Sequence, residues 1–319
     1  FAFVTQAAGI TNSGFGSTDT VKGGAGSDTV QIGLNGVGTY TLNTTEFNNK
    51  SGIEVLDIRG QTNDITVSSE VVAAIDTGKF TIRTDKMVQT SAASSADVTG
   101  GSAAESTSTS IINLTALNQN QGVAVIGGSG SERIVVDNAA LNAAIEIDGG
   151  TNGGVAGRYD TLTILDTTVA DDGDLANVRG IESIILAETV NGNSRFDLTL
   201  TAAFLLNNTA AVNAVATTID ESVFRIGSAT SSTGTALNAG DVVTVDISGL
   251  LNATRTGLAA SLAGRGIDVT LPAGVTVNYV VDGAPASPAQ VGFVTKADAA
   301  RADAGVVSAA GSVTFNVVG

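Results

Sequence analysis

A chain of 319 residues is long enough to bury a sizeable core, and this length is compatible with one large domain or two. It has 15 Lys and Arg against 31 Asp and Glu, a formal net charge of −16, which disfavours binding to nucleic acid or an anionic membrane and favours cations as partners. Because the chain has no Cys and no His, it lacks disulfides, thiolate nucleophiles, zinc–sulfur sites and the commonest general base, so most familiar hydrolase mechanisms are excluded.

Short runs with alternating apolar and polar residues recur along the first half of the chain. They are rich in β-branched residues and bounded by Gly, Asn or Asp, which is typical of strands about five residues long. The strands are predicted at 29–33, 55–60, 133–138, 144–150 and 161–166. A further alternating run, 240–250, begins with a Gly-Asp pair and is explained by a plain alternating strand.

Helical spacing is sparse, and the polar segment 87–110 has no apolar periodicity, so it is expected to be a surface excursion. Short helices are predicted at 68–78, from Asn138 onward, at 256–264 and at 295–305. The chain has 39 Gly and only 3 Pro, so its turns are expected to use positive φ angles rather than proline bends. The predicted fold is mainly β.

No stretch approaches the roughly 18–20 continuous apolar residues that a membrane span requires. The chain starts with "FAFVTQAAGI", which has neither an initiator Met nor the charged region of a signal peptide. We therefore expect no membrane insertion, and a mature form or a piece of a longer protein.

Two glycine-rich segments follow one another near the start of the chain. "GGAGSDTVQ" (23–31) fits the nonapeptide G-G-x-G-x-D-x-U-x at every defined position, and "GFGSTDTVK" (14–22) has its Asp and apolar residue in phase one repeat earlier. Glycines such as Gly24 and Gly26 allow sharp turns with carbonyl oxygens pointing inward, and Asp19 and Asp28 add carboxylates. Such hard oxygen ligands suit Ca²⁺, which makes these four residues candidate calcium ligands.

Two later segments are degenerate versions of the same motif. "GGSGSERIV" (127–135) has Glu132 at the aspartate position, and "DGGTNGGVAGRYDTLTI" (148–164) retains a Gly-rich turn and Asp160 with extra residues between them. Glu132 and Asp160 are therefore also candidate calcium ligands. The alternative for every one of these turns is a carboxylate that caps its own backbone, and for Glu132 this alternative is favoured. For the acidic cluster 171–174, a solvated turn is favoured over a cation site.

These motifs resemble those of RTX secreted calcium-binding proteins. The turns, the Ala/Thr/Gly/Val-rich composition and the absence of Cys look most like bacterial surface-layer proteins of the Caulobacter type. The resemblance implies a parallel β-roll or β-solenoid with calcium between stacked turns, plus a β-rich C-terminal part with a few short helices. It also implies that the two repeats at 14–31 supply half-sites, whose partner ligands come from elsewhere. The motif match covers roughly the first 190 residues.

A longer repeat of about 130 residues is also predicted. The Asp28 turn is followed by a Gly-Ile-Glu strand at 52–58, and the Asp160 turn by a similar strand at 180–186. The Gly-rich repeats stop near residue 195–200. We therefore expect an RTX-like solenoid over 1–198 and a β-rich domain or solenoid continuation over 199–319.

The leading functional expectation is a non-enzymatic structural protein at the cell surface, a calcium-dependent, self-assembling surface layer, sheet or filament. Calcium is abundant outside the cell and is kept low in the cytosol. Weak sites with a Kd of about 10⁻⁴–10⁻³ M would therefore stay empty, and the chain unfolded, until export. The expected partners are further copies of the chain, and a cell-surface polysaccharide is another candidate. An RTX adhesin or biofilm-matrix module is the alternative. A polysaccharide-degrading enzyme or its calcium module is disfavoured, because three Tyr, no Trp and no His leave little for sugar stacking or proton transfer.

Overall fold

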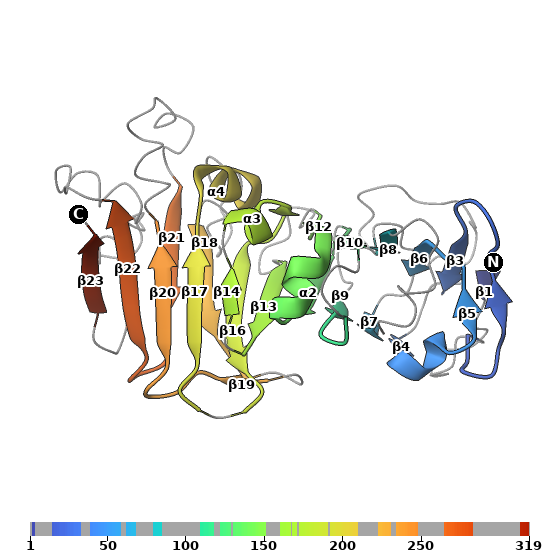
Figure 1. The fold of residues 1–319 in the computed structure, drawn as a ribbon, viewed down its shortest axis with the longest axis horizontal. Coiled ribbons are helices and arrows are strands. Elements are labelled where there is room, and N and C mark those ends of the chain that lie inside the picture. The colour runs from blue at the N-terminus through green and yellow to red at the C-terminus, as the bar shows by residue number, and fades with distance from the viewer. Residues whose placement is uncertain are drawn as a thin grey trace. The chain divides into compact units, whose positions relative to one another are not determined.

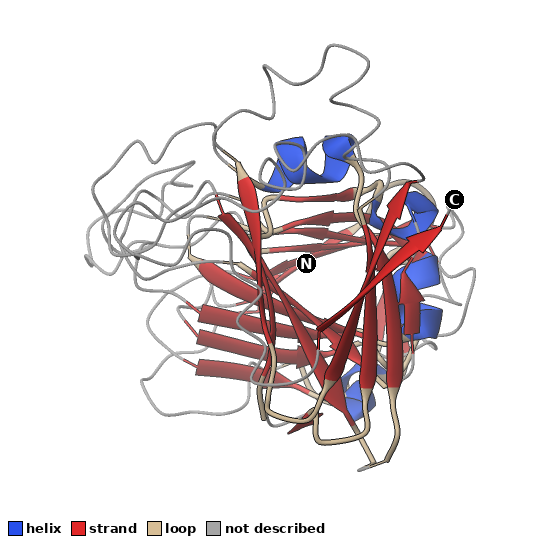
Figure 2. Ribbon diagram, turned by 90° about the vertical axis from the view of Figure 1, so that its left-hand side faces the viewer, coloured by secondary structure: helices blue, strands red, loops and turns tan. Residues whose placement is uncertain are grey.

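The fold is mainly β, as predicted, and its few helices are short (Figure 2). The chain divides into two compact units, Phe1–Thr161 and Leu162–Gly319. Among the described residues, no helix has the length and apolar character needed to cross a membrane. The computed structural model describes residues 2–3, 15–32, 39–58, 62–67, 79–84, 109–117, 122–128, 130–150, 160–166, 168–170, 172–190, 192–209, 223–230, 234–247, 265–282 and 313–318.

The first unit distributes its strands in alternation between two parallel sheets (Figure 1). One sheet has the order β1-β3-β6-β8-β10-β12, with strands at Ala2–Phe3, Thr29–Ile32, Val55–Ile58, Lys79–Arg83, Gly122–Ile126 and Ala144–Asp148. The other has the order β4-β7-β9-β11, with strands at Thr39–Leu42, Thr62–Thr66, Thr109–Asn113 and Ser131–Val136. Strands that follow one another in sequence therefore lie mostly in different sheets, and each strand pairs with the strands of its own sheet that come before and after it in the sequence.

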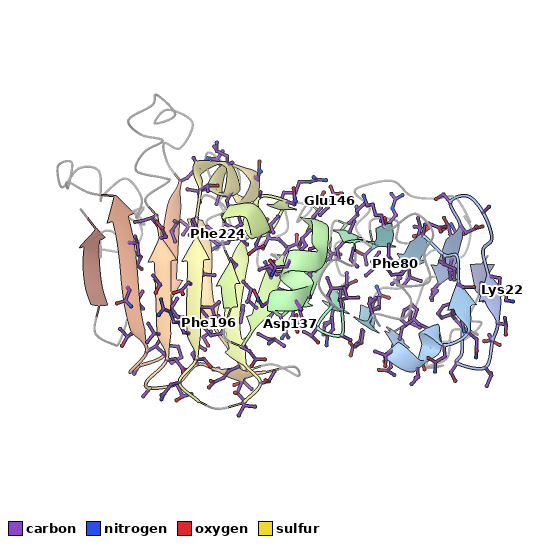
Figure 3. The ribbon with its side chains drawn as sticks, in the orientation of Figure 1. Lys22, Phe80, Asp137, Glu146, Phe196 and Phe224 are labelled. Carbon is purple, nitrogen blue, oxygen red and sulfur yellow. The ribbon has the colours of Figure 1, made fainter. Side chains whose placement is uncertain are left out.

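Register between these strands aligns apolar side chains into rows. In the first sheet, successive register partners are Val30, Leu56, Ile82, Val125 and Ile147, all of them buried. In the second sheet, the corresponding row is Leu42, Ile65, Ile112 and Ile134, also buried. Because successive side chains of a strand point to opposite faces, alternation in the sequence produces one apolar face on each strand. The stacked rows form the core of this unit, where Phe80 is also buried (Figure 3).

A small two-stranded parallel sheet lies near the start of the first unit. It pairs β2 (Val21–Lys22) with β5 (Lys50–Ser51), and the 3₁₀ helix η1 (Thr44–Phe47) precedes β5. The same unit contains α2 (Asn138–Ala143), whose N-cap residue Asp137 accepts a hydrogen bond from the Ala140 N–H at 2.8 Å. This cap satisfies one of the unpaired N–H groups that every helix has at its N-terminus.

The second unit also contains two sheets. One has the order β13-β16-β18-β21 and the other the order β14-β17-β20-β22-β23, whose strands run side by side in Figure 1. The pairings described between strands here are parallel, except that β19 pairs with β16 antiparallel. The strands are β13 (Thr161–Leu165), β14 (Thr168–Ala170), β15 (Val178–Arg179), β16 (Ser183–Glu188), β17 (Arg195–Thr199), β18 (Val223–Ser228), β19 (Thr235–Ala236), β20 (Val242–Asp246), β21 (Gly266–Thr270), β22 (Thr276–Asp282) and β23 (Val313–Val318).

Among the described residues of this unit, two short helices accompany these strands, α3 (Asp172–Leu175) and α4 (Ala202–Asn208). The ring of Phe204 on α4 meets that of Phe224 on β18 edge to face, with centroids 4.9 Å apart. Phe196 and Phe224 are fully buried (Figure 3). Aromatic packing of this kind fixes α4 against the sheet.

The five strands predicted for the first half are confirmed as β3, β6, β11, β12 and β13, and the alternating run at 240–250 contains β20. The helix predicted from Asn138 is confirmed as α2, whereas α4 was not predicted. The helices predicted at 68–78, 256–264 and 295–305 lie outside the described residues. The polar segment 87–110 also lies outside them, except at its end, where Thr109 begins β9. The domain boundary near residue 198 and the 130-residue repeat remain predictions.

Candidate functional site: acidic residues at the strand entrances

The turn that best fits the nonapeptide, 23–28, packs closely against Gly52, which lies shortly before β6. A Cβ atom on Gly23 would lie 1.6 Å from the carbonyl oxygen of Gly52, so only glycine fits there. Gly24 and Gly26 have φ angles of 102° and 116°, which favour glycine, and the space around their Cα atoms is open. The sequence thus positions a half-buried Asp28 directly before β3.

Asp28 is linked to Glu54, a residue that the sequence analysis placed only within a repeated strand. The Asp28 N–H donates to Glu54 Oε2 at 2.6 Å, and the Asp28 carbonyl accepts hydrogen bonds from the N–H groups of Glu54 and Val55. Glu54 is 5% exposed, and its Oε1 is buried without a hydrogen-bond partner among the described residues. An unpaired buried carboxylate oxygen is costly, so this position favours a cation.

The preceding turn, which contains Asp19, is organised differently. Asp19 Oδ2 accepts a hydrogen bond from the Gly16 N–H at 2.7 Å, and the Asp19 N–H donates to the Gly16 carbonyl at 3.0 Å. This carboxylate therefore caps its own turn, the alternative that the sequence left open. The ammonium group of Lys50, which the sequence did not single out, donates to carbonyl oxygens of the same turn.

Glu132 and Asp160 were predicted from separate motifs, and the structure brings them together. The Glu132 N–H donates to Asp160 Oδ1 at 2.6 Å, and the two residues are 1% and 0% exposed. Glu132 Oε1 accepts a hydrogen bond from the Thr84 hydroxyl at 3.2 Å. Burial raises the pKa of Glu132, and the charge of Asp148 raises it further, while hydrogen bonds to Asp160, Thr84 and the Gly128 backbone act in the opposite direction.

The second unit contains a closed hydrogen-bond network that the sequence analysis missed. Asp241 accepts hydrogen bonds from the N–H groups of Ser194 and Asn238, at 2.7 and 2.6 Å. Glu188 accepts hydrogen bonds from the side chains of the same two residues, at 2.9 and 2.5 Å. Both acidic residues are fully buried, and Glu188 also accepts a hydrogen bond from the Gly192 N–H. Ser194 and Asn238 thus bridge two carboxylates that sequence spacing does not relate.

A common arrangement links these positions. Glu54, Asp160 and Asp241 each directly precede a strand, and each side chain accepts the N–H of a residue that lies 26, 28 or 47 positions earlier. The donors lie near the start of another strand: Asp28 and Ser194 directly precede β3 and β17, and Glu132 is the second residue of β11. The carboxylate supplies an acceptor where the backbone ladder begins, and such charge-assisted hydrogen bonds are short and strong.

The described residues contain no group of three or more acidic side chains close enough to hold a metal ion. A calcium ion at the second turn would therefore need backbone carbonyls and further ligands besides Asp28 and Glu54. Comparison of the chain with protein-family models, curated proteins and solved structures finds no match.

Proposed function

We propose that this protein is a structural component of an extracellular, self-assembling layer, sheet or filament, built as a β-solenoid with calcium at its second Gly-rich turn. The observation that carries the calcium site is the buried Oε1 of Glu54, which has no hydrogen-bond partner among the described residues. Asp28, whose backbone N–H donates to Glu54 Oε2, would supply a second carboxylate, and Gly24 and Gly26 of the same turn have open space where a Cβ atom would stand. Calcium binds oxygen ligands of this type.

Charge supports calcium as the link between copies of the chain. Subunits with a net charge near −16 repel one another over a Debye length of about 8 Å at physiological ionic strength. Aromatic residues, which commonly anchor interfaces, make up only 4% of the chain. Divalent ions that bridge carboxylates of neighbouring subunits would remove the repulsion and make the contact specific.

Sheet topology supports an assembling protein. Within the described residues, β21 and β23 are the last strands of the two sheets of the second unit. An outer strand presents N–H and C=O groups that pair readily with a strand of another chain. Since calcium is scarce in the cytosol and abundant outside the cell, a calcium-dependent assembly would form after export.

The test is sedimentation together with negative-stain microscopy of the purified chain under three conditions: millimolar calcium, EGTA, and sodium chloride that matches the screening of calcium. We expect sheets or filaments in calcium alone. The Glu54→Gln variant should assemble poorly in calcium, and Glu146→Gln, a half-buried acidic residue on β12, is the matched control.

Two outcomes would contradict the proposal. Equal assembly in sodium chloride would reduce calcium to general charge screening. A monomer that persists in millimolar calcium would exclude calcium-driven self-assembly and favour an adhesin module.

A further inference from the structure

Lys50 is a buried lysine whose ammonium group lies in the first Gly-rich turn. The residue is 6% exposed and belongs to β5. Its Nζ donates to the carbonyl oxygens of Gly16, Asp19 and Asn48 at 2.8, 2.7 and 3.0 Å. Since an ammonium group has three N–H donors, each of them has a carbonyl acceptor here.

The neighbouring residue completes the same turn. Asn49 has a φ angle of 61°, and its side-chain amide donates to the Ser17 carbonyl at 3.0 Å. The consecutive residues Asn49 and Lys50 thus donate hydrogen bonds to three carbonyl oxygens of the turn 16–19. Backbone carbonyls beside an aspartate are also the groups that a calcium-binding turn directs at its ion. In this turn they are directed at a side-chain cation.

One aromatic side chain lies over the ammonium group. Nζ lies 4.8 Å from the ring centroid of Phe15, close enough for a cation–π interaction. Phe15 packs edge to face against Phe47, with centroids 5.8 Å apart, and both residues are buried. Burial lowers the pKa of Lys50, and the negative charges of Asp19 and Glu46 oppose this effect. The three carbonyl acceptors offset the cost of removing the ammonium group from water.

We propose that Lys50 is a built-in cation of the first Gly-rich turn, which makes the carbonyls of Gly16, Asp19 and Asn48 a binding site for a primary ammonium group rather than for calcium. Residues 15–22 then reach their native structure without a metal ion. This role does not depend on calcium at the second turn, where the described partners of Asp28 are Glu54 and Val55. The two consecutive nonapeptides therefore use different cations.

The test is amide hydrogen exchange at Gly16 and Asp19, measured by NMR in EGTA so that the second turn does not contribute. The Lys50→Ala variant should exchange about ten- to a hundredfold faster at these two amides, because the ammonium that holds the turn is lost. Adding n-propylammonium, which replaces the removed Cγ, Cδ, Cε and Nζ atoms, should slow the exchange again. Adding n-propanol, which fills the same space without an ammonium group, should not. Lys22→Ala removes an exposed lysine from the paired strand β2 and is the matched control.

Unchanged protection in Lys50→Ala, or equal rescue by n-propanol, would overturn the proposal. A second measurement needs no variant and applies even if Lys50→Ala does not fold. In the wild-type chain, the Gly16 and Asp19 amides should keep their protection when calcium is replaced by EGTA. Loss of that protection would show that the first turn depends on a metal ion after all. Neither result decides whether Asp28 and Glu54 bind calcium, which the assembly experiment tests separately.

Discussion

Asp160 Oδ1 accepts the backbone N–H of Glu132 at 2.6 Å, and Glu54 Oε2 accepts that of Asp28 at the same distance. In both pairs, the acidic residue directly before a strand uses its side chain to accept a backbone N–H, which adds one hydrogen bond where the pairing of the strands begins. The residues that a motif search marks as metal ligands thus contribute to the backbone structure directly.

The calcium site is expected to depend on Asp28 and Glu54 much more than on Glu132. Asp28→Asn and Glu54→Gln should each lower calcium affinity, because each removes a carboxylate that the proposed site would use. Glu132→Gln should change the affinity less, because Glu132 stands where the nonapeptide has an aspartate and its Oε1 accepts the Thr84 hydroxyl, although its Oε2, like Glu54 Oε1, is buried without a hydrogen-bond partner among the described residues. Isothermal titration with calcium gives the ranking. Equal losses in all three variants would contradict it.

Glu132 should make the stability of the fold depend on pH. Burial raises its pKa in the folded chain above the ordinary value of 4.5, so the folded state binds more protons than the unfolded state at pH values between the unfolded-state pKa and the folded-state pKa. The contribution of Glu132 to the free energy of unfolding is therefore full below about pH 4.5 and falls as pH rises through its folded pKa, by at most about 1.4 kcal/mol per pH unit.

Glu132→Gln removes this titration, so its stability relative to wild type should increase as pH rises from 4.5. Urea unfolding in EGTA across this range measures the difference between the two proteins. Glu146→Gln serves as the control for loss of an acidic residue. A difference that is constant with pH would show that Glu132 does not titrate in this range.

Two adjacent glycines should respond differently to alanine. Gly23→Ala should destabilise the fold strongly, because its Cβ would lie 1.6 Å from the carbonyl oxygen of Gly52 and the backbone must shift. Gly24→Ala should cost about 1–2 kcal/mol, because its only penalty is a positive φ angle. Denaturant unfolding of both variants tests the ranking, and a larger loss in Gly24→Ala would contradict it.

Removing Asp241 should destabilise the second unit. Asp241→Ala leaves the N–H groups of Ser194 and Asn238 without their acceptor, at an expected cost of about 2–4 kcal/mol in the free energy of unfolding. Asp246→Ala, at the other end of β20 and half-buried, is the matched control and should cost less. Similar losses in the two variants would show that the network with Glu188 does not stabilise the fold.

The buried Gly-Ile-Glu positions test the predicted repeat. Ile53 and Ile181 are 4% and 0% exposed, as the sequence predicted, and the glycines before them have φ angles of 61° and 63°. Each isoleucine changed to alanine should cost about 2–5 kcal/mol, measured by urea unfolding. Similar losses would agree with one structural unit used twice, although β6 and β16 belong to different sheets. A loss at only one position would argue against it.

The strands were predicted well because their signals are local. The alternation of apolar and polar residues, and the turn residues that flank it, can be recognised within five or six residues. It missed Lys50 and Glu54, whose roles are defined by partners about 26–34 positions away and therefore by strand register. Helix α4 was missed because its sequence, "AAFLLNN", is short, and its stability comes from packing between Phe204 and Phe224. Its start does have a local signal, since the Thr201 hydroxyl accepts the Phe204 N–H.

The buried row of Val30, Leu56, Ile82, Val125 and Ile147 has a consequence for how the chain is made. Each member pairs with a residue of the neighbouring strand in its sheet, and those strands follow one another along the chain, so a partly synthesised chain already contains complete pairs. Folding can then proceed from one end of the chain as the chain is synthesised. Each new strand pairing closes only a short loop, so the loss of loop-closure entropy is divided among many small steps. A strand at the growing end remains exposed only until the next winding covers it.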